Sequence, residues 1–389
     1  MKHFISLSNY WVDFVLITVF FGTFYYMFRE IPHIDLKDHL SLLQDYLDNN
    51  YFPIPPGYYG LIYALDLIIR VKYPFVASAV ILLTFLMYFK YRATLDWIRT
   101  YFRNDYSSSF IFAISISLLF LSPIYVPFID KDYWYLGKFT PTIWHNSTLI
   151  CVFPFCILLV KNTLEWLKEN DKKRLLLMFF YAFIILLIKP SFLFCFIPAF
   201  PIYALLVTRR INKEVIIASS FSLVIFAFIL LEKFLIFTWD PMINILYEDE
   251  QRSQIVLWPL HVWLKFAREP IFDFLSSFPL LIGYLFFWRK SAFQSSFFNF
   301  SLCLLSFAVL IYFILGETGF REYHGNFYWQ IPIALYLNNL SILMVALKKY
   351  LNDNRKMDLA LCTVSTVFII QFLLGLGYWA RIFVFGNLS

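Results

Sequence analysis

Long apolar runs recur along the whole chain and are separated by short polar segments. A helix needs about 20 apolar residues to cross the hydrocarbon core of a bilayer, and somewhat shorter runs also suffice. Eleven runs fit that description, at 10–28, 74–89, 107–127, 145–160, 175–189, 191–208, 215–237, 271–287, 292–315, 328–347 and 358–378. The pattern therefore predicts an all-α integral membrane protein of about eleven transmembrane helices.

The segment 29–73 departs from this pattern. Leucine recurs within 36–48 at the spacing of one helical face. The run 57–70 is apolar but short, and it contains Asp66 and Arg70. We expect both stretches to be helices that lie on the membrane surface rather than cross it. The segment 29–73 is thus predicted to be one long external loop with two interfacial helices.

Composition supports a membrane protein. Of the 389 residues, 60% are hydrophobic and only 15% are charged, with a mean hydropathy of +0.67. One soluble core of this size cannot bury so much apolar surface, whereas lipid is itself an apolar solvent. We therefore expect residues 1–389 to form a single transmembrane bundle.

Charge alternates between successive connections. One set of segments holds 19 Lys and Arg against 8 Asp and Glu, and the opposite set holds 12 against 17. The basic set comprises 1–9, 90–105, 161–174, 209–214, 289–290 and 348–358. Because Lys and Arg are enriched on the cytoplasmic side, we predict a multi-pass protein of the plasma membrane with a cytoplasmic N-terminus and an external C-terminus. The net charge of +6 reflects this topology and gives no reason to expect a nucleic-acid partner.

The external loop contains a candidate catalytic cluster. Asp35, Asp38 and His39 are spaced i, i+3 and i+4, so they share one face of a helix. Two carboxylates and an imidazole suit the deprotonation of a hydroxyl, and they also suit a divalent cation. The alternative is a solvated helix whose acidic first turn is favoured by the helix dipole.

The second predicted external loop is rich in aromatic and polar residues. It contains Lys138, and His145 and Asn146 stand where the next helix begins, a position whose backbone N–H groups favour anions. The alternative is an interfacial aromatic belt with an asparagine cap.

Further cations stand on the same predicted side. Lys189 lies between two apolar runs, where a charge is costly unless it faces a polar cavity or a partner. Snorkelling to the interface is the alternative for this lysine. In the fourth loop Arg321, His324 and Gly325 suit a phosphate site, because arginine can bind phosphate through two parallel hydrogen bonds. Pairing of Arg321 with Glu317 or Glu322 is the alternative.

With these features the chain resembles the GT-C superfamily of polytopic membrane glycosyltransferases, of the bacterial envelope-polysaccharide type. The resemblance rests on a first span followed by a long external loop with an early acid, here Asp35 or Asp38. Two surface helices joined by a proline-rich segment, here 53–57, complete it.

The resemblance implies an inverting enzyme that transfers a sugar from a polyprenyl-phosphate donor to a glycan or lipid-linked acceptor on the outer face. The acid in the first external loop would be the general base, and the resemblance does not decide between Asp35 and Asp38. Basic residues would hold the lipid phosphate, with Arg321, Lys189, His145 and Lys138 as candidates. No cofactor is required, although a divalent cation is compatible with the acids. The rival hypotheses are an O-antigen polymerase or ligase, a membrane acyltransferase, and a transporter or flippase.

Overall fold

The structure, a computed structural model, describes residues 7–32, 34–69, 75–103, 105–130, 135–242 and 253–385. Within these ranges eight helices are long and apolar enough to cross a membrane, or nine if one bent pair counts as a span. The eight are α1 (Leu7–Glu30), α4 (Val76–Phe102), α6 (Ser147–Glu169), α8 (Ser191–Thr208), α9 (Lys213–Phe234), α14 (Ser296–Ile314), α15 (Gln330–Asn352) and α16 (Leu359–Phe385). The chain is a multi-pass helical membrane protein, and the lipid bilayer is its environment.

The other elements are shorter. The bent pair is α12 (Pro270–Ser277) and α13 (Pro279–Trp288), which meet at 68°. The remaining helices are α2 (Asp35–Asp48), α3 (Pro56–Ile69), α5 (Ser108–Ser117), α7 (Lys172–Ile188) and α11 (His261–Phe266). The strands β1 (Ile255–Leu257) and β2 (Leu315–Glu317) pair antiparallel, with Ile255 opposite Glu317. Apart from this short ladder, the described fold is helical, as predicted.

The predicted count of eleven spans is not confirmed. The helix α7 has 17 residues, which is the lower limit for a crossing. The predicted span 107–127 is helical only as far as Phe120, through α5 and one 3₁₀ turn, and then becomes irregular. Hydropathy identified its apolar character correctly but not its conformation.

A partner helix stabilises this irregular segment. The side chain of Gln371 in α16 donates to the carbonyl of Ser122 at 3.0 Å, while the N–H of Ser122 donates to the Gln371 carbonyl at 3.2 Å. One turn further along α16, a Cβ on Gly375 would lie only 1.2 Å from the Phe120 carbonyl oxygen. Non-helical backbone at membrane depth is tolerated where protein buries it and satisfies its polar groups. Glycine at 375 permits that close approach.

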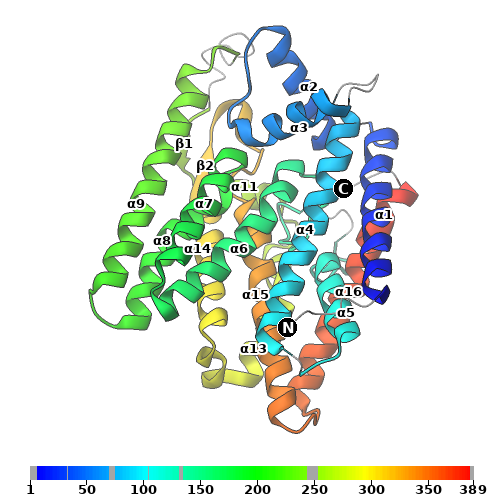
Figure 1. Cartoon of the computed structure of the whole chain (residues 1–389), viewed down its shortest axis with the longest axis vertical. Helices are drawn as coiled ribbons and strands as arrows, with labels where there is room; N and C mark the ends of the chain where they lie inside the picture. Colours follow the sequence, from blue (N-terminus) through cyan, green and yellow to red (C-terminus); the bar gives the residue numbers. More distant parts are fainter. Residues whose placement is uncertain are drawn as a thin grey trace.

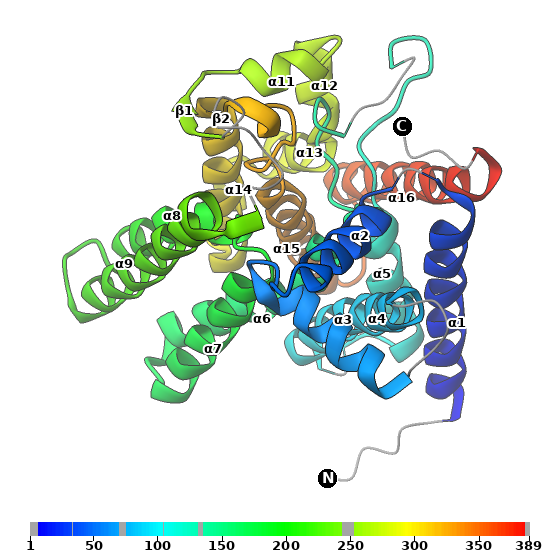
Figure 2. The ribbon, with the colours of Figure 1, turned by 90° about the horizontal axis from the view of Figure 1, so that it is seen from above.

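The helices α2 and α3 lie across one end of the bundle (Figures 1 and 2). Gly57, in the first turn of α3, packs on the last turn of α7, where a Cβ would lie 2.6 Å from the Leu187 carbonyl oxygen. This contact places the end of α7, and therefore Lys189, beneath the two surface helices. The turns that follow α8, α13 and α15 lie at the opposite end of the molecule (Figure 1).

Burial separates central helices from peripheral ones. In α6 and α15, 78% and 89% of the most apolar window is buried, against 33% in α9 and 28% in α16. Peripheral helices leave large apolar side chains exposed, including Leu223 of α9 at 68% and Leu373 of α16 at 58%. Such side chains are compatible with lipid contact, because helix surfaces in a bilayer need no polar cover.

Candidate functional site

A cavity of about 1140 Å³ lies beneath α2, between α8, α9 and the segment that follows α14. It receives side chains from parts of the chain that are far apart in sequence. Seven of the nine predicted site residues line it: Asp35, Asp38, His39, Asn146, Lys189, Arg321 and His324. The two others, His145 and Lys138, do not. The fold therefore gathers most of the predicted polar groups around one space.

One face of α2 lines this cavity. Its residues Asp35, Asp38, His39, Leu42 and Tyr46 recur at i, i+3, i+4, i+7 and i+11 and therefore share that face. Three of the leucines that the sequence pattern placed on one helical face are buried against the bundle. Burial of those leucines fixes the rotation of α2 and so turns its acidic face toward the cavity.

The structure distinguishes the two candidate carboxylates. Asp35 Oδ2 lies 3.4 Å from the backbone N of Ser147, at the N-terminus of α6, and 3.5 Å from His39 Nε2. The positive end of the helix dipole and an imidazole N–H both favour a carboxylate there. The side chain of Asp38 is exposed and makes no hydrogen bond or ion pair with another residue in the described part of the chain. Asp35 is therefore the more firmly positioned acid.

His39 links Asp35 to α3. Its Nδ1 lies 2.7 Å from the hydroxyl of Tyr59, which also lines the cavity. Burial lowers the pKa of His39, although the charge of Asp35 acts in the opposite direction. The imidazole is thus neutral at pH 7. When Nδ1 accepts from the Tyr59 hydroxyl, the ring proton is on Nε2, 3.5 Å from Asp35 Oδ2.

Lys189 connects α7 to α8 and faces the cavity. Its Nζ donates to Thr148 Oγ1 at 2.9 Å and to Asn146 Oδ1 at 3.3 Å, and lies 5.1 Å from the Trp329 ring centroid. Asn146 also caps α6, since its Oδ1 accepts from the Leu149 N–H at 2.9 Å. No carboxylate within 4 Å pairs with Lys189 in the described part of the chain. Its charge remains available to an anion in the cavity.

Arg321 approaches the cavity from the opposite end of the sequence. Its guanidinium lies over the ring of Phe237, 4.7 Å from the centroid. The proposed pairings with acids are not seen among the described residues. Glu322 instead contacts His261 at 2.7 Å, and Glu317 accepts from Asn326 at 2.6 Å. The fork of Arg321 is therefore available for a ligand.

The neighbours of Arg321 also face the cavity. Burial lowers the pKa of His324, and the charge of Arg321 lowers it further, so this imidazole is neutral at pH 7. Gly325 adopts a φ of +63°, and a Cβ there would lie 2.5 Å from Leu136. The close approach that this glycine permits is thus to the second external segment, and it brings that segment and the fourth together.

His145 lies behind the site rather than in it. It is buried, neither ring nitrogen has a hydrogen-bond partner in the described structure, and its ring packs on Tyr135 with centroids 4.7 Å apart. Burial lowers its pKa to about 4. A neutral, buried imidazole outside the cavity wall cannot contribute a cation for a phosphate.

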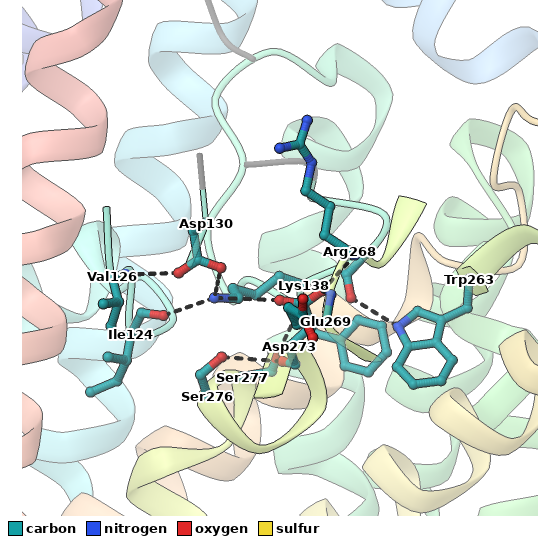
Figure 3. Close-up of polar contacts among 12 residues, drawn as sticks. Ile124, Val126, Asp130, Lys138, Trp263, Arg268, Glu269, Asp273, Ser276 and Ser277 are labelled. Carbon is teal, nitrogen blue, oxygen red and sulfur yellow. Dashed lines mark hydrogen bonds and ion pairs between the residues drawn. The ribbon is translucent and has the colours of Figure 1, made fainter. Parts of the chain in front are cut away.

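Lys138 lies in a separate buried cluster (Figure 3). Its ammonium group contacts a carboxylate oxygen of Asp130, the Ile124 carbonyl oxygen at 3.1 Å, and Asp273 at 3.7 Å. The lysine is only 2% exposed. The sequence-based hypothesis of Lys138 as a phosphate ligand does not fit this position, because its charge is neutralised by two acids.

Other polar residues line the cavity and were not singled out from the sequence. They include Tyr46, Tyr59, Glu232, Lys233 and Asp240. One feature of the sequence could have identified Glu232 as a candidate, because it is an acid next to a long apolar run. No feature of the sequence distinguished the two tyrosines, because they resemble the many interfacial aromatic residues of this chain.

The cavity continues as an apolar surface along α8 and α9. Phe194 and Ile197 of α8 and Phe226, Ile229 and Leu230 of α9 line it. The space is thus polar beneath α2 and apolar toward the middle of these helices. Such a gradient suits an amphipathic ligand with a charged head group.

Comparison with models of protein families finds no match, and a search of curated proteins likewise finds none. Across the ranges that the structure describes, no three His, Cys, Asp or Glu side chains are grouped so as to hold a metal ion. The interpretation of the site therefore rests on its geometry.

Proposed function

We propose that the protein is an inverting membrane glycosyltransferase of the GT-C type. It transfers a sugar from a polyprenyl-phosphate donor to a glycan or lipid-linked acceptor on the outer face of a bacterial inner membrane. The observation that carries the proposal is the single cavity in which Asp35, Lys189 and Arg321 meet above an apolar surface. A lipid phosphate with an isoprenoid chain has the matching distribution of charge and apolar surface.

The cations act on the leaving group. As the bond between the sugar and the phosphate breaks, negative charge grows on the phosphate oxygen. Arg321 provides two parallel N–H donors, and Lys189 has a third N–H beyond its bonds to Asn146 and Thr148. Donors that are fixed before the reaction stabilise this charge without reorganisation.

Asp35 acts as the general base. It accepts the proton of the acceptor hydroxyl while that oxygen forms the new bond to the anomeric carbon and the lipid phosphate leaves. The imidazole of His39 and the hydroxyl of Tyr59 orient the carboxylate. Asp38, which is exposed on the same face, is the less firmly held alternative.

Orientation in the membrane follows from charge. The basic turns lie at the end opposite α2 and α3 (Figure 1). If that end is cytoplasmic, the cavity opens to the outer face, the N-terminus is inside and the C-terminus is outside. The proposed reaction requires no cofactor.

The test is a transfer assay with the purified protein in nanodiscs. Undecaprenyl phosphate carrying glucose, galactose, mannose or N-acetylglucosamine is supplied with membrane glycolipid extract, and release of free undecaprenyl phosphate is measured. We expect Asp35→Asn to lower turnover by about 10²–10⁴, with Asp38→Asn much less affected and both variants melting like the wild type. Wild-type turnover in Asp35→Asn would remove the proposed base, and no release from any donor by the wild type would contradict the proposed activity.

A further inference from the structure

The wall of the cavity formed by α9 ends in an unusual turn. Residues Leu235–Trp239 form a π-helical turn, after which the Asp240 N–H donates to the Leu235 carbonyl oxygen at 2.8 Å. Such turns shift the side chains that follow them to another angular position, and they are frequent at functional sites. Here the turn directs Asp240 toward the far end of α2.

Asp240 is buried, at 4% exposure, yet lines the cavity. Its Oδ2 accepts from the Tyr46 hydroxyl at 2.5 Å, and its Oδ1 accepts from the Met242 N–H at 3.0 Å. Both donors are neutral. A carboxylate can accept about four hydrogen bonds, so these two donors from the described residues leave Asp240 acceptor capacity toward the cavity.

A second carboxyl group stands on the same wall. Glu232 of α9 is 8% exposed and lines the cavity, and its Oε2 has no hydrogen-bond partner in the described structure. An unpaired carboxyl group next to apolar helix surface is costly, so a binding role is the default expectation. This buried, unsatisfied group points independently to a ligand on the α9 wall.

We infer that Tyr46, Asp240 and Glu232 form a polar subsite that binds the hydroxyl groups of a sugar. Tyr46 lies eleven residues after Asp35 on the cavity-facing side of α2, so this subsite lies beyond the base, toward the C-terminal end of that helix. The choice of a sugar as ligand rests on the proposed function.

The position of Arg321 favours the sugar of the donor. Its guanidinium covers Phe237, which lies within the π-helical turn just before Asp240. A phosphate held by Arg321 therefore lies near the turn that carries Asp240, and its attached sugar is within reach of that carboxylate. The sugar of an acceptor has the same hydroxyl chemistry, so the experiment must separate the two sources.

The test measures binding to the full protein in nanodiscs. The donor probes are undecaprenyl phosphate alone and the same lipid carrying glucose, galactose, mannose or N-acetylglucosamine. The acceptor probes are soluble lactose, cellobiose and chitobiose, titrated with bare undecaprenyl phosphate bound. The variants are Asp240→Asn, Glu232→Gln and Tyr46→Phe, and Asp45→Asn is the control because Asp45 is exposed on α2 and does not line the cavity.

We expect at least one sugar to raise wild-type affinity above that of the bare lipid phosphate. Loss of a charged acceptor in Asp240→Asn should lower that sugar-dependent gain by about tenfold. Affinity for the bare lipid should stay within about twofold, because the sugar hydroxyls are absent from that probe. A gain confined to the soluble disaccharides and lost in Asp240→Asn would retain the subsite and assign it to the acceptor.

Two results would overturn the subsite. One is that no sugar binds better than the bare lipid, and the other is that the gain survives in all three variants while their melting temperatures match the wild type. Tyr46→Phe removes only a hydroxyl and keeps the ring, so it still tests the subsite if the charge variants fail to fold. Failure of the wild type to bind bare undecaprenyl phosphate would instead contradict the proposed function, since the phosphate site of Arg321 and Lys189 is common to every lipid probe.

Discussion

Lys138 and Lys189 are two buried lysines in very different surroundings. Lys138 directs its ammonium group at three oxygen atoms, two of which belong to the carboxylates of Asp130 and Asp273 (Figure 3). Lys189 meets only the neutral oxygens of Asn146 and Thr148, and it faces a cavity. Two carboxylates thus surround the ammonium group of Lys138, whereas among the described residues no carboxylate lies within 4 Å of Lys189, which keeps one N–H donor for a ligand.

The two lysines differ in the feature that distinguishes a cation with a structural role from a cation that can bind a ligand. Lys138 hydrogen-bonds to the Ile124 carbonyl and to Asp130, and Asp273 at 3.7 Å adds a second carboxylate, so acids of the protein itself compensate its charge. The Lys138 cluster instead joins the irregular segment after α5 to α12, because Lys138 contacts Ile124 and Asp130 in that segment and Asp273 in α12. Mutations should therefore affect stability around Lys138 and ligand binding around Lys189.

The largest effect expected is on folding, from Lys138→Met. Removing the lysine leaves Asp130 and Asp273 buried without their cation, and breaking a buried pair in this way costs about 3–5 kcal/mol. Thermal unfolding in detergent measures the loss. Lys189→Met is the matched control and should melt close to the wild type, because it strands no acid. Equal destabilisation by the two substitutions would contradict the assignment of a structural role to Lys138 and a binding role to Lys189.

The next effect concerns Arg321. Charge-assisted hydrogen bonds to an anion contribute about 1.5–3 kcal/mol, so Arg321→Ala should weaken binding of undecaprenyl phosphate about 10- to 100-fold. Arg321→Lys should recover only part, because a point charge does not reproduce the planar fork. Binding is measured in nanodiscs beside melting temperature. Unchanged affinity with a lowered melting temperature would make Arg321 a structural residue like Lys138.

A smaller effect is expected from Tyr59→Phe. The change removes the hydroxyl that contacts His39 Nδ1, so the imidazole no longer has a fixed orientation toward Asp35. One neutral hydrogen bond contributes about 0.5–1.5 kcal/mol, which predicts a loss of about 2- to 10-fold in kcat with little change in KM. Tyr63→Phe on the same helix is the control, since Tyr63 is exposed and does not line the cavity. Equal kcat in both variants would exclude Tyr59 as a positioning residue.

The last effect, similar in size to that of Tyr59→Phe, is on the pH dependence of stability. His145 precedes α6 and has a pKa near 4, against about 6.5 in the unfolded chain. The unfolded state therefore binds more protons as pH falls below about 6.5, and stability is lost from there toward pH 4. Between pH 7.5 and 5.5 this one group contributes about 1.4 kcal/mol to the loss. His145→Phe should flatten the fall in melting temperature over that range, and an unchanged slope would contradict the buried neutral imidazole.

The sequence by itself determined the membrane class and the cavity-facing side of α2. Both follow from local patterns, because transfer into lipid depends on each residue's own apolar surface, and helical spacing alone places Asp35 and His39 on one face. The burial of Leu36 and Leu40 confirms that face. The basic turns near one end of the molecule follow from the same local reasoning.

Only the tertiary structure decided which charged side chains lie near one another. Arg321 reaches a cavity shared with Asp35 although 286 residues separate them, while Lys138, eight residues from Asp130, is neutralised by it. The end of the helical segment near Phe120 likewise depends on Gln371. This residue of α16 forms hydrogen bonds with the chain beyond Phe120 that the local sequence does not reveal. Hydropathy and spacing are local properties, whereas the free energy of a buried charge or carbonyl depends on the partner that folding brings to it.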